Sequence, residues 1–240
     1  MSYSAQRTGL LKGLTALAAV LFAVAIYLDL FWVGPEATQG AAQRVFYVHL
    51  GAFLGAFIAF SAVVVAGIAY LRTRNPKWDT LGLASVEMGL GFSLITIITG
   101  MTWARPIWNT WWTWDPRLTS VAIMWLAYAA YVMLRTGIED PERRRRFAAV
   151  YGIIAFASVI FTIVIVRVRP DTIHPVVAGP TQADPTGGFE VAGDMKTTLF
   201  FNMITFALIT LVLVWHRIRL ENLVHYIERR KMEVLAELSR

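Results

Sequence analysis

Six long apolar runs constrain what this chain can fold into. Each run is long enough to cross the roughly 30 Å hydrocarbon core of a bilayer as a helix that rises about 1.5 Å per residue. A soluble domain of 240 residues could not bury a sequence that is 57% hydrophobic and only 16% charged. We therefore predict an all-α integral membrane protein with six transmembrane helices, near residues 14–31, 46–71, 81–101, 118–134, 147–166 and 197–215.

The segments between the runs differ in their content of lysine and arginine. Sixteen of the 22 basic residues lie on the side that holds both termini, and the other six lie on the opposite side. Loops rich in these residues stay in the cytoplasm, so we predict that both termini are cytoplasmic. This topology also explains the net charge of +6. We therefore predict that the chain contacts the lipid bilayer and does not bind nucleic acid.

The same topology predicts how the chain is organised. We expect a six-helix transmembrane domain over residues 1–215 and a cytoplasmic C-terminal helix over 216–240. Loops 102–117 and 167–196 then lie on the extracytoplasmic side, and the second of them is too rich in proline and glycine to be helical throughout. The chain has no cysteine, which excludes thiolate ligands and disulfides.

The extracytoplasmic loop 102–117 concentrates aromatic side chains. It holds five of the nine tryptophans, which together carry roughly 1,000 Å² of mostly apolar surface. Protein, lipid headgroups or a large flat ligand must cover that surface. The spacings of three and four after Pro106 predict a short helix with one aromatic face, although an aromatic belt at the membrane interface remains an alternative. The five are Trp103, Trp108, Trp111, Trp112 and Trp114.

Two of the four histidines fall on the side of the tryptophans. His49 lies near the outer end of the second run and His174 in the loop after the fifth, whereas the other two histidines are cytoplasmic. Neutral imidazole is a good ligand for iron, indoles can cover a porphyrin, and arginine pairs with carboxylates such as the haem propionates. Arg44 and Arg117 lie on the same side, so the residues needed to hold haem are present together.

Three further features favour structural roles. Asp115-Pro116 is typical of an N-cap followed by proline in the first turn of a helix. Gly51 and Gly55 are spaced as in close-packed membrane helices. Glu87 lies in the third run about two turns from its cytoplasmic end, where a carboxylate is either functional or reaches to the membrane surface.

The tryptophan-rich stretch, WARPIWNTWWTWDPRLT over residues 103–119, resembles the WWD signature of proteins that handle haem during cytochrome c maturation. The length and the six-span layout are similar to those of the CcmC (haem exporter protein C) family. The resemblance covers essentially the whole chain. The segment RVFYVH at 44–49 is similar to the family's first histidine segment, and TIH at 172–174 is similar to the second.

This resemblance implies a function in the bacterial cytoplasmic (inner) membrane. The chain would bind haem b (iron protoporphyrin IX) at its extracytoplasmic face and deliver it to the haem chaperone CcmE, without being an enzyme. It would associate with the ABC transporter CcmA/CcmB and the small membrane protein CcmD. His49 and His174 would be the axial iron ligands, and Arg44 and Arg117 would be propionate partners. The platform for haem and chaperone would be Trp103, Trp108, Trp111, Trp112, Trp114 and Asp115.

Three other functions are weaker interpretations of the same sequence. A haem lyase (cytochrome c synthase) subunit of the CcsA or CcmF type shares the WWD loop, but such proteins are longer and carry additional histidines inside the membrane. A transporter permease would need polar residues along its spans, which here are nearly free of them apart from Glu87. A b-type electron carrier would need histidines that face each other inside the bundle.

Overall fold

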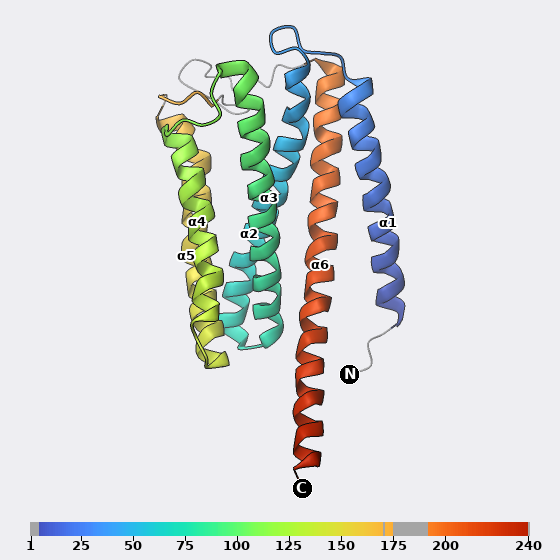
Figure 1. Ribbon diagram of the computed structural model, residues 1–240, viewed down its shortest axis with the longest axis vertical. Coiled ribbons are helices and arrows are strands. Elements are labelled where there is room, and N and C mark those ends of the chain that lie inside the picture. The colour runs from blue at the N-terminus through green and yellow to red at the C-terminus, as the bar shows by residue number, and fades with distance from the viewer. Residues whose placement is uncertain (1–4, 170, 175–191, 240) are drawn as a thin grey trace.

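The polypeptide folds into a bundle of six long helices (Figure 1). The structure, a computed structural model, describes residues 5–169, 171–174 and 192–239. Within these ranges, six helices are long and apolar enough to cross a membrane, which confirms the predicted all-α fold. They are α1 (Ala5–Tyr27), α2 (Val45–Thr73), α3 (Pro76–Trp108), α4 (Pro116–Thr136), α5 (Pro141–Val168) and α6 (Gly193–Leu238).

Polar caps extend the helices beyond the apolar runs. Helices α3, α4 and α5 each begin with Asn or Asp followed by proline, and the caps are Asn75, Asp115 and Asp140. Each cap side chain accepts hydrogen bonds from backbone amides two or three residues ahead. Proline suits the first helical position because it has no N–H to leave unpaired. The predicted N-cap at Asp115 is therefore confirmed.

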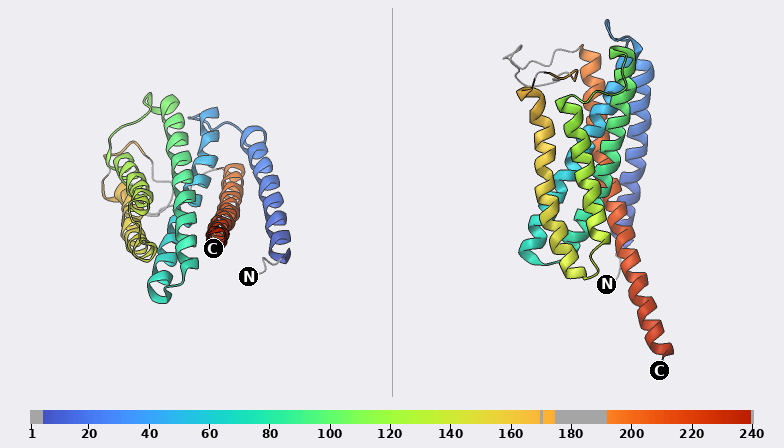
Figure 2. Two further views of the ribbon diagram at one scale, coloured as in Figure 1. Left: turned by 60° about the horizontal axis from the view of Figure 1, so that its bottom comes forward. Right: turned by 60° about the vertical axis from the view of Figure 1, so that its left-hand side comes forward.

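Helix α2 lies at the centre of the bundle, where it packs against α3, α5 and α6. Helices α4 and α5 form a pair on one side, and α1 packs on α6 at the other side (Figures 1 and 2). Gly51 and Gly55 of α2 face α6, since a Cβ atom at Gly51 would lie 2.5 Å from the ring of Phe206. The small residues thus allow the close helix contact that their spacing predicts.

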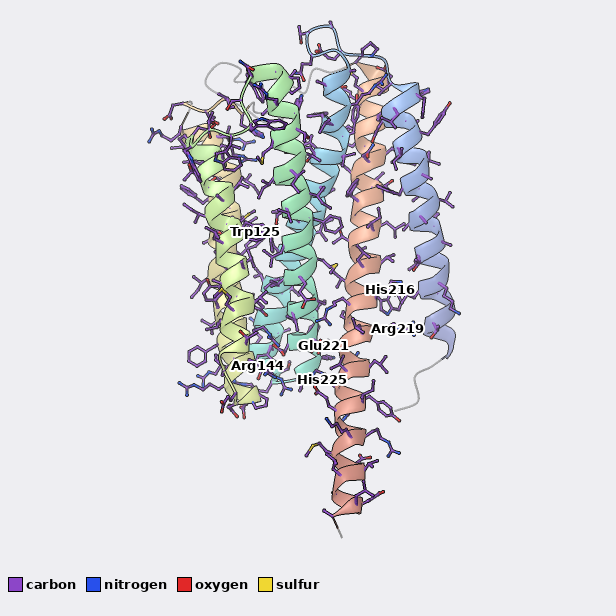
Figure 3. The ribbon with its side chains drawn as sticks, in the orientation of Figure 1. Trp125, Arg144, His216, Arg219, Glu221 and His225 are labelled. Carbon is purple, nitrogen blue, oxygen red and sulfur yellow. The ribbon has the colours of Figure 1, made fainter. Side chains whose placement is uncertain are left out.

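The tryptophan loop and the two chain termini lie at opposite ends of the bundle. We call the end that carries residues 103–117 the tryptophan end; the two termini lie toward the other end, where α6 projects beyond its neighbours (Figure 2). His216 and His225 lie on this half of α6 (Figure 3). His216 Nε2 is 2.8 Å from Thr15 Oγ1 on α1. Helix α6 continues into the tail without a break, and a domain boundary at residue 215 stays a prediction.

Ion pairs join the helices at the end opposite the tryptophans. Glu87 on α3 accepts two hydrogen bonds from the guanidinium of Arg217 on α6. On the same helix, Asp79 Oδ1 lies 2.5 Å from Nη1 of Arg135 on α4. Glu87 is therefore an ion-pair partner that ties α3 to α6, which accounts for a carboxylate at this depth.

Gly89→Ala is expected to destabilise the bundle, because the new methyl group would lie 2.4 Å from the ring of Phe60 on α2. Overpacking of this kind lowers the free energy of unfolding by about 1–3 kcal/mol. Gly91→Ala is the matched control on the same helix, since a Cβ atom there meets nothing within 4 Å and alanine favours a helix. Thermal unfolding in detergent should give a lower Tm for Gly89→Ala only. Equal Tm values would contradict the packing of α2 on α3.

Candidate functional site

An apolar cavity of about 450 Å³ lies within the bundle and extends to the tryptophan end. Its volume is within the range of about 300–1,000 Å³ that is typical of small-molecule sites. Helices α2 to α6, the loop after α3 and the segment 171–174 all contribute to its walls. Seven of the predicted site residues line it: His49, His174, Trp103, Trp108, Trp111, Trp112 and Arg117.

The two histidines face the same cavity from different elements. His49 lies in the second turn of α2 and is 8% exposed, and His174 lies in the segment after α5 and is partly buried. Their ring centroids are 6.2 Å apart, with the planes inclined by 38°. Metal–imidazole bonds are about 2 Å long, so two imidazoles bound on opposite sides of one metal atom have ring centres roughly 6 to 6.5 Å apart. The observed separation matches this requirement.

The tryptophan loop differs from the predicted short helix after Pro106, and that prediction is wrong. Pro106 lies inside α3, which continues to Trp108. Asn109 then takes the left-handed conformation, with φ of 54°, and Arg105 donates to its side chain and carbonyl. A left-handed residue ends a helix, and the residue before Pro116 must be extended. Residues 110–115 therefore form an irregular link between the two helices.

The tryptophans consequently divide between two positions. Trp103 and Trp108 lie on α3 with ring centroids 6.1 Å apart, and with Trp111 and Trp112 they line the cavity. Trp114 does not line the cavity and is 76% exposed. The indole N–H of Trp112 is buried and has no hydrogen-bond partner within the described ranges. Four indoles thus wall the cavity, and the fifth faces outward.

Asp115 lies beside the cavity and connects the tryptophan loop to the histidine segment. Its carboxylate accepts hydrogen bonds from the Thr113 hydroxyl at 2.9 Å and from the Ile173 amide at 3.4 Å, in addition to capping α4. Burial alone would raise the pKa of Asp115, but hydrogen bonds from the Leu118 amide and from neighbouring hydroxyls outweigh it and lower that pKa. The Asp115 carboxylate thus links the tryptophan loop to Ile173, the neighbour of His174.

The two predicted arginines differ in their relation to the cavity. Arg117 lines it, and its guanidinium donates to the carbonyl of Thr162 on α5. Arg44 ends the 3₁₀ turn Ala41–Arg44 before α2 and does not line the cavity. The Nε–H of Arg44 is buried and has no partner in the part of the chain that the structure describes. Arg117 therefore faces the cavity directly, whereas Arg44 lies outside its walls.

The sequence profile of one protein family, described as Heme exporter protein C, matches residues 2–234. The chain belongs to the heme exporter protein C family. The resemblance inferred from the tryptophan stretch is thus confirmed over nearly the whole chain.

Individual members of the heme exporter protein C family are similar to this chain at modest identity. The Heme exporter protein C of Bradyrhizobium diazoefficiens is 32% identical over 145 residues, which are 60% of this chain and 54% of that protein. Its counterpart in Paracoccus denitrificans is 28% identical over 205 residues, or 85% and 81%. That of Escherichia coli K12 is 25% identical over 193 residues, or 80% and 75%. The match spans about half the length of the first relative and most of the other two.

Several cavity residues were absent from the prediction. Phe53, Phe57 and Phe60 form part of the apolar wall, and they follow His49 by 4, 8 and 11 residues. This spacing places them on the same face of a helix as His49, so the periodicity could have identified them. Arg167 on α5 also lines the cavity. In the sequence it served only to assign topology, and no local pattern separates it from an arginine that anchors a helix end.

Proposed function

We propose that this chain binds haem b at the extracytoplasmic face of the bacterial inner membrane and delivers it to a CcmE-like chaperone for cytochrome c maturation. The observation that carries the proposal is the 6.2 Å separation of the His49 and His174 rings within an apolar, tryptophan-walled cavity. Haem is the cargo of the protein. Holding it and handing it over require axial ligation but no covalent catalysis by this chain, so we propose a carrier and not an enzyme.

The donor set fits haem. A porphyrin supplies four nitrogen ligands to its iron, so the protein has to supply only two axial ones, which are common as histidine. The apolar cavity walls suit the porphyrin face. Arg117 and Arg167 offer guanidinium groups at the cavity that would pair with propionate carboxylates. The buried Trp112 N–H, which has no partner among the described residues, offers a further donor. Arg44 remains a candidate for the same role through its Nε–H, which has no partner among the described residues.

The positions of the two histidines suggest that His49 holds the haem and that His174 controls its release. His49 is on a central, packed helix, whereas His174 is on a short segment outside the helices. His49 would therefore keep a fixed orientation toward the iron. His174 would complete the ligation and would be able to withdraw when the segment moves, and Asp115 would limit that movement through the Ile173 amide.

Membership of the heme exporter protein C family supports a proposal for the partners. We propose that the CcmE-like chaperone approaches the tryptophan end, where Trp114 is exposed. The transporter CcmA/CcmB and the small membrane protein CcmD would contact the chain within or beside the bilayer. The haem lyase alternative gains no support from the described helices.

The haem content of the purified protein tests the proposal. The full chain, purified in detergent and titrated with haem, should give a saturable absorption change with one haem per chain. A pyridine haemochrome assay should identify the haem as b type, free of covalent attachment. Absence of saturable binding would contradict the proposed function.

Topology is expected to follow the distribution of basic residues, which favours the cytoplasm for both termini. A reporter that is active only outside the cytoplasm should work when inserted at Gly187, which lies outside the described residues, and should fail at the C-terminus. Because the tryptophan end and the two termini lie at opposite ends of the bundle, the reverse pattern would put the cavity on the cytoplasmic side and contradict the proposal.

A further inference from the structure

Two neighbouring residues of α3, Thr99 and Gly100, contact the ring of His49. The Nδ1 atom of His49 lies 3.2 Å from Thr99 Oγ1. A Cβ atom at Gly100 would lie 3.1 Å from Cε1 and 3.5 Å from Nδ1 of the same ring. One residue thus offers the imidazole a polar partner, and the other lets the ring approach the helix backbone closely.

The hydrogen bonds of Thr99 favour one of the two positions for the proton on the His49 ring. Thr99 Oγ1 lies 2.7 Å from the carbonyl of Ile95 and 3.1 Å from that of Thr96. Carbonyls only accept hydrogen bonds, and a hydroxyl has a single proton to donate. The shorter distance to the Ile95 carbonyl favours a Thr99 hydroxyl that donates to its own helix and accepts from His49. The Thr96 backbone is a further hydrogen-bond partner of the His49 ring. In that arrangement the Nδ1 atom of the neutral ring would carry the proton, and Nε2 would keep its lone pair.

We propose that Thr99 and Gly100 are positioning residues for His49. Thr99 selects the Nδ1–H tautomer and fixes the rotation of the ring, and Gly100 provides the space that this position needs. The Nε2 atom is then available as a metal ligand before haem arrives, because metal-bound histidines typically donate their other N–H to a nearby acceptor. This inference rests on the proposed function, since the tautomer matters for haem only if His49 binds the iron.

Nuclear magnetic resonance of the haem-free chain tests the tautomer directly. The chain has four histidines, so ¹⁵N-histidine labelling gives four ring systems, and His49→Ala identifies the signals of His49. At a pH where the ring is neutral, we expect a protonated Nδ1 and an unprotonated Nε2. A His49 ring with its proton on Nε2 in the wild-type chain would overturn the inference, whatever the haem measurements show.

Substitutions of Thr99 separate its hydroxyl from its shape. Thr99→Val should shift His49 toward the Nε2–H tautomer and weaken haem binding by about 10–100-fold, the usual effect of losing such a partner. Thr99→Ser should restore both properties. Thr102→Val is the matched control, because the exposed Thr102 hydroxyl donates to the Thr99 carbonyl of its own helix and has no other partner among the described residues. A Thr99→Val chain with the tautomer and haem affinity of Thr102→Val would refute the role of Thr99.

Gly100→Ala tests the space beside the ring. The new methyl group would push His49 away from α3 by a few tenths of an ångström, so haem affinity should fall and the His49 ring signals should move. Gly91→Ala introduces the same methyl group into the same helix with nothing within 4 Å and should leave both unchanged. Identical behaviour of the two variants would remove Gly100 from the proposal. Failure of the wild-type chain to bind haem would contradict the proposed function, and the haem-free spectra would still decide the inference.

Discussion

Replacing either His49 or His174 with alanine is expected to lower the affinity for haem by more than about 100-fold. The loss of an axial nitrogen should exceed the roughly 10–100-fold effect of losing only a hydrogen-bond partner of that ligand. At high haem concentration each variant should give a five-coordinate, high-spin spectrum where the wild-type chain gives a six-coordinate one. Added imidazole should partly restore the six-coordinate spectrum, because it supplies the missing nitrogen. Absorption titration of each purified variant checks both effects.

The other two histidines provide matched controls. His216 contacts Thr15 and His225 contacts Glu221, far along α6 from the cavity. Alanine at either position should leave the haem spectrum and the affinity unchanged. Wild-type spectra in both His49→Ala and His174→Ala would show that neither residue binds the iron. If His216→Ala or His225→Ala lost as much haem as His49→Ala and His174→Ala, the loss would reflect general destabilisation of the fold.

Trp114→Ala is expected to abolish capture of the chaperone while leaving haem binding near the wild-type level. Trp114 is 76% exposed and does not line the cavity, and tryptophans that become buried at interfaces commonly contribute 2 kcal/mol or more to binding, roughly a 30-fold change in affinity. Trp112→Ala should instead lower haem binding, because Trp112 lines the cavity and its buried N–H has no partner in the described ranges. Co-purification of haem and of a tagged CcmE-like chaperone measures both properties for each variant.

Trp32 is the control for a general role in the membrane interface. It ends the π-helical turn after α1, is 46% exposed and does not line the cavity. Trp32→Ala should retain both haem and chaperone. Equal retention of the chaperone by Trp32→Ala and Trp114→Ala would make Trp114 part of an aromatic belt and would remove it from the proposed docking surface.

The helices were predictable because lipid imposes a simple rule on sequence. A backbone inside the hydrocarbon core must satisfy its own hydrogen bonds, so each apolar run of sufficient length becomes a helix. The runs underestimated helix lengths, since polar caps such as Asn75 and Asp140 start helices outside the bilayer core. Contacts between helices, such as the pairing of Glu87 with Arg217, join residues 130 positions apart and leave no local pattern.

The candidate site was predictable in its residue types and less so in its geometry. Counting histidines and tryptophans on one membrane face selected His49, His174 and four indoles that share one cavity. The helical spacing of the tryptophans misled, because Asn109 in the left-handed conformation ends α3 earlier than a continuous pattern implies. The contact of Thr99 with His49 was also inaccessible, since it depends on how α2 and α3 pack.

Electron paramagnetic resonance of the ferric haem complex tests the central claim most directly, because the spectrum reports the number and type of axial ligands. The account predicts a low-spin signal typical of two histidine ligands for the wild-type chain, and its conversion to a high-spin signal in both His49→Ala and His174→Ala. A high-spin signal in the wild-type chain, or a low-spin signal that survives both substitutions, would contradict the assignment of these two histidines as the iron ligands.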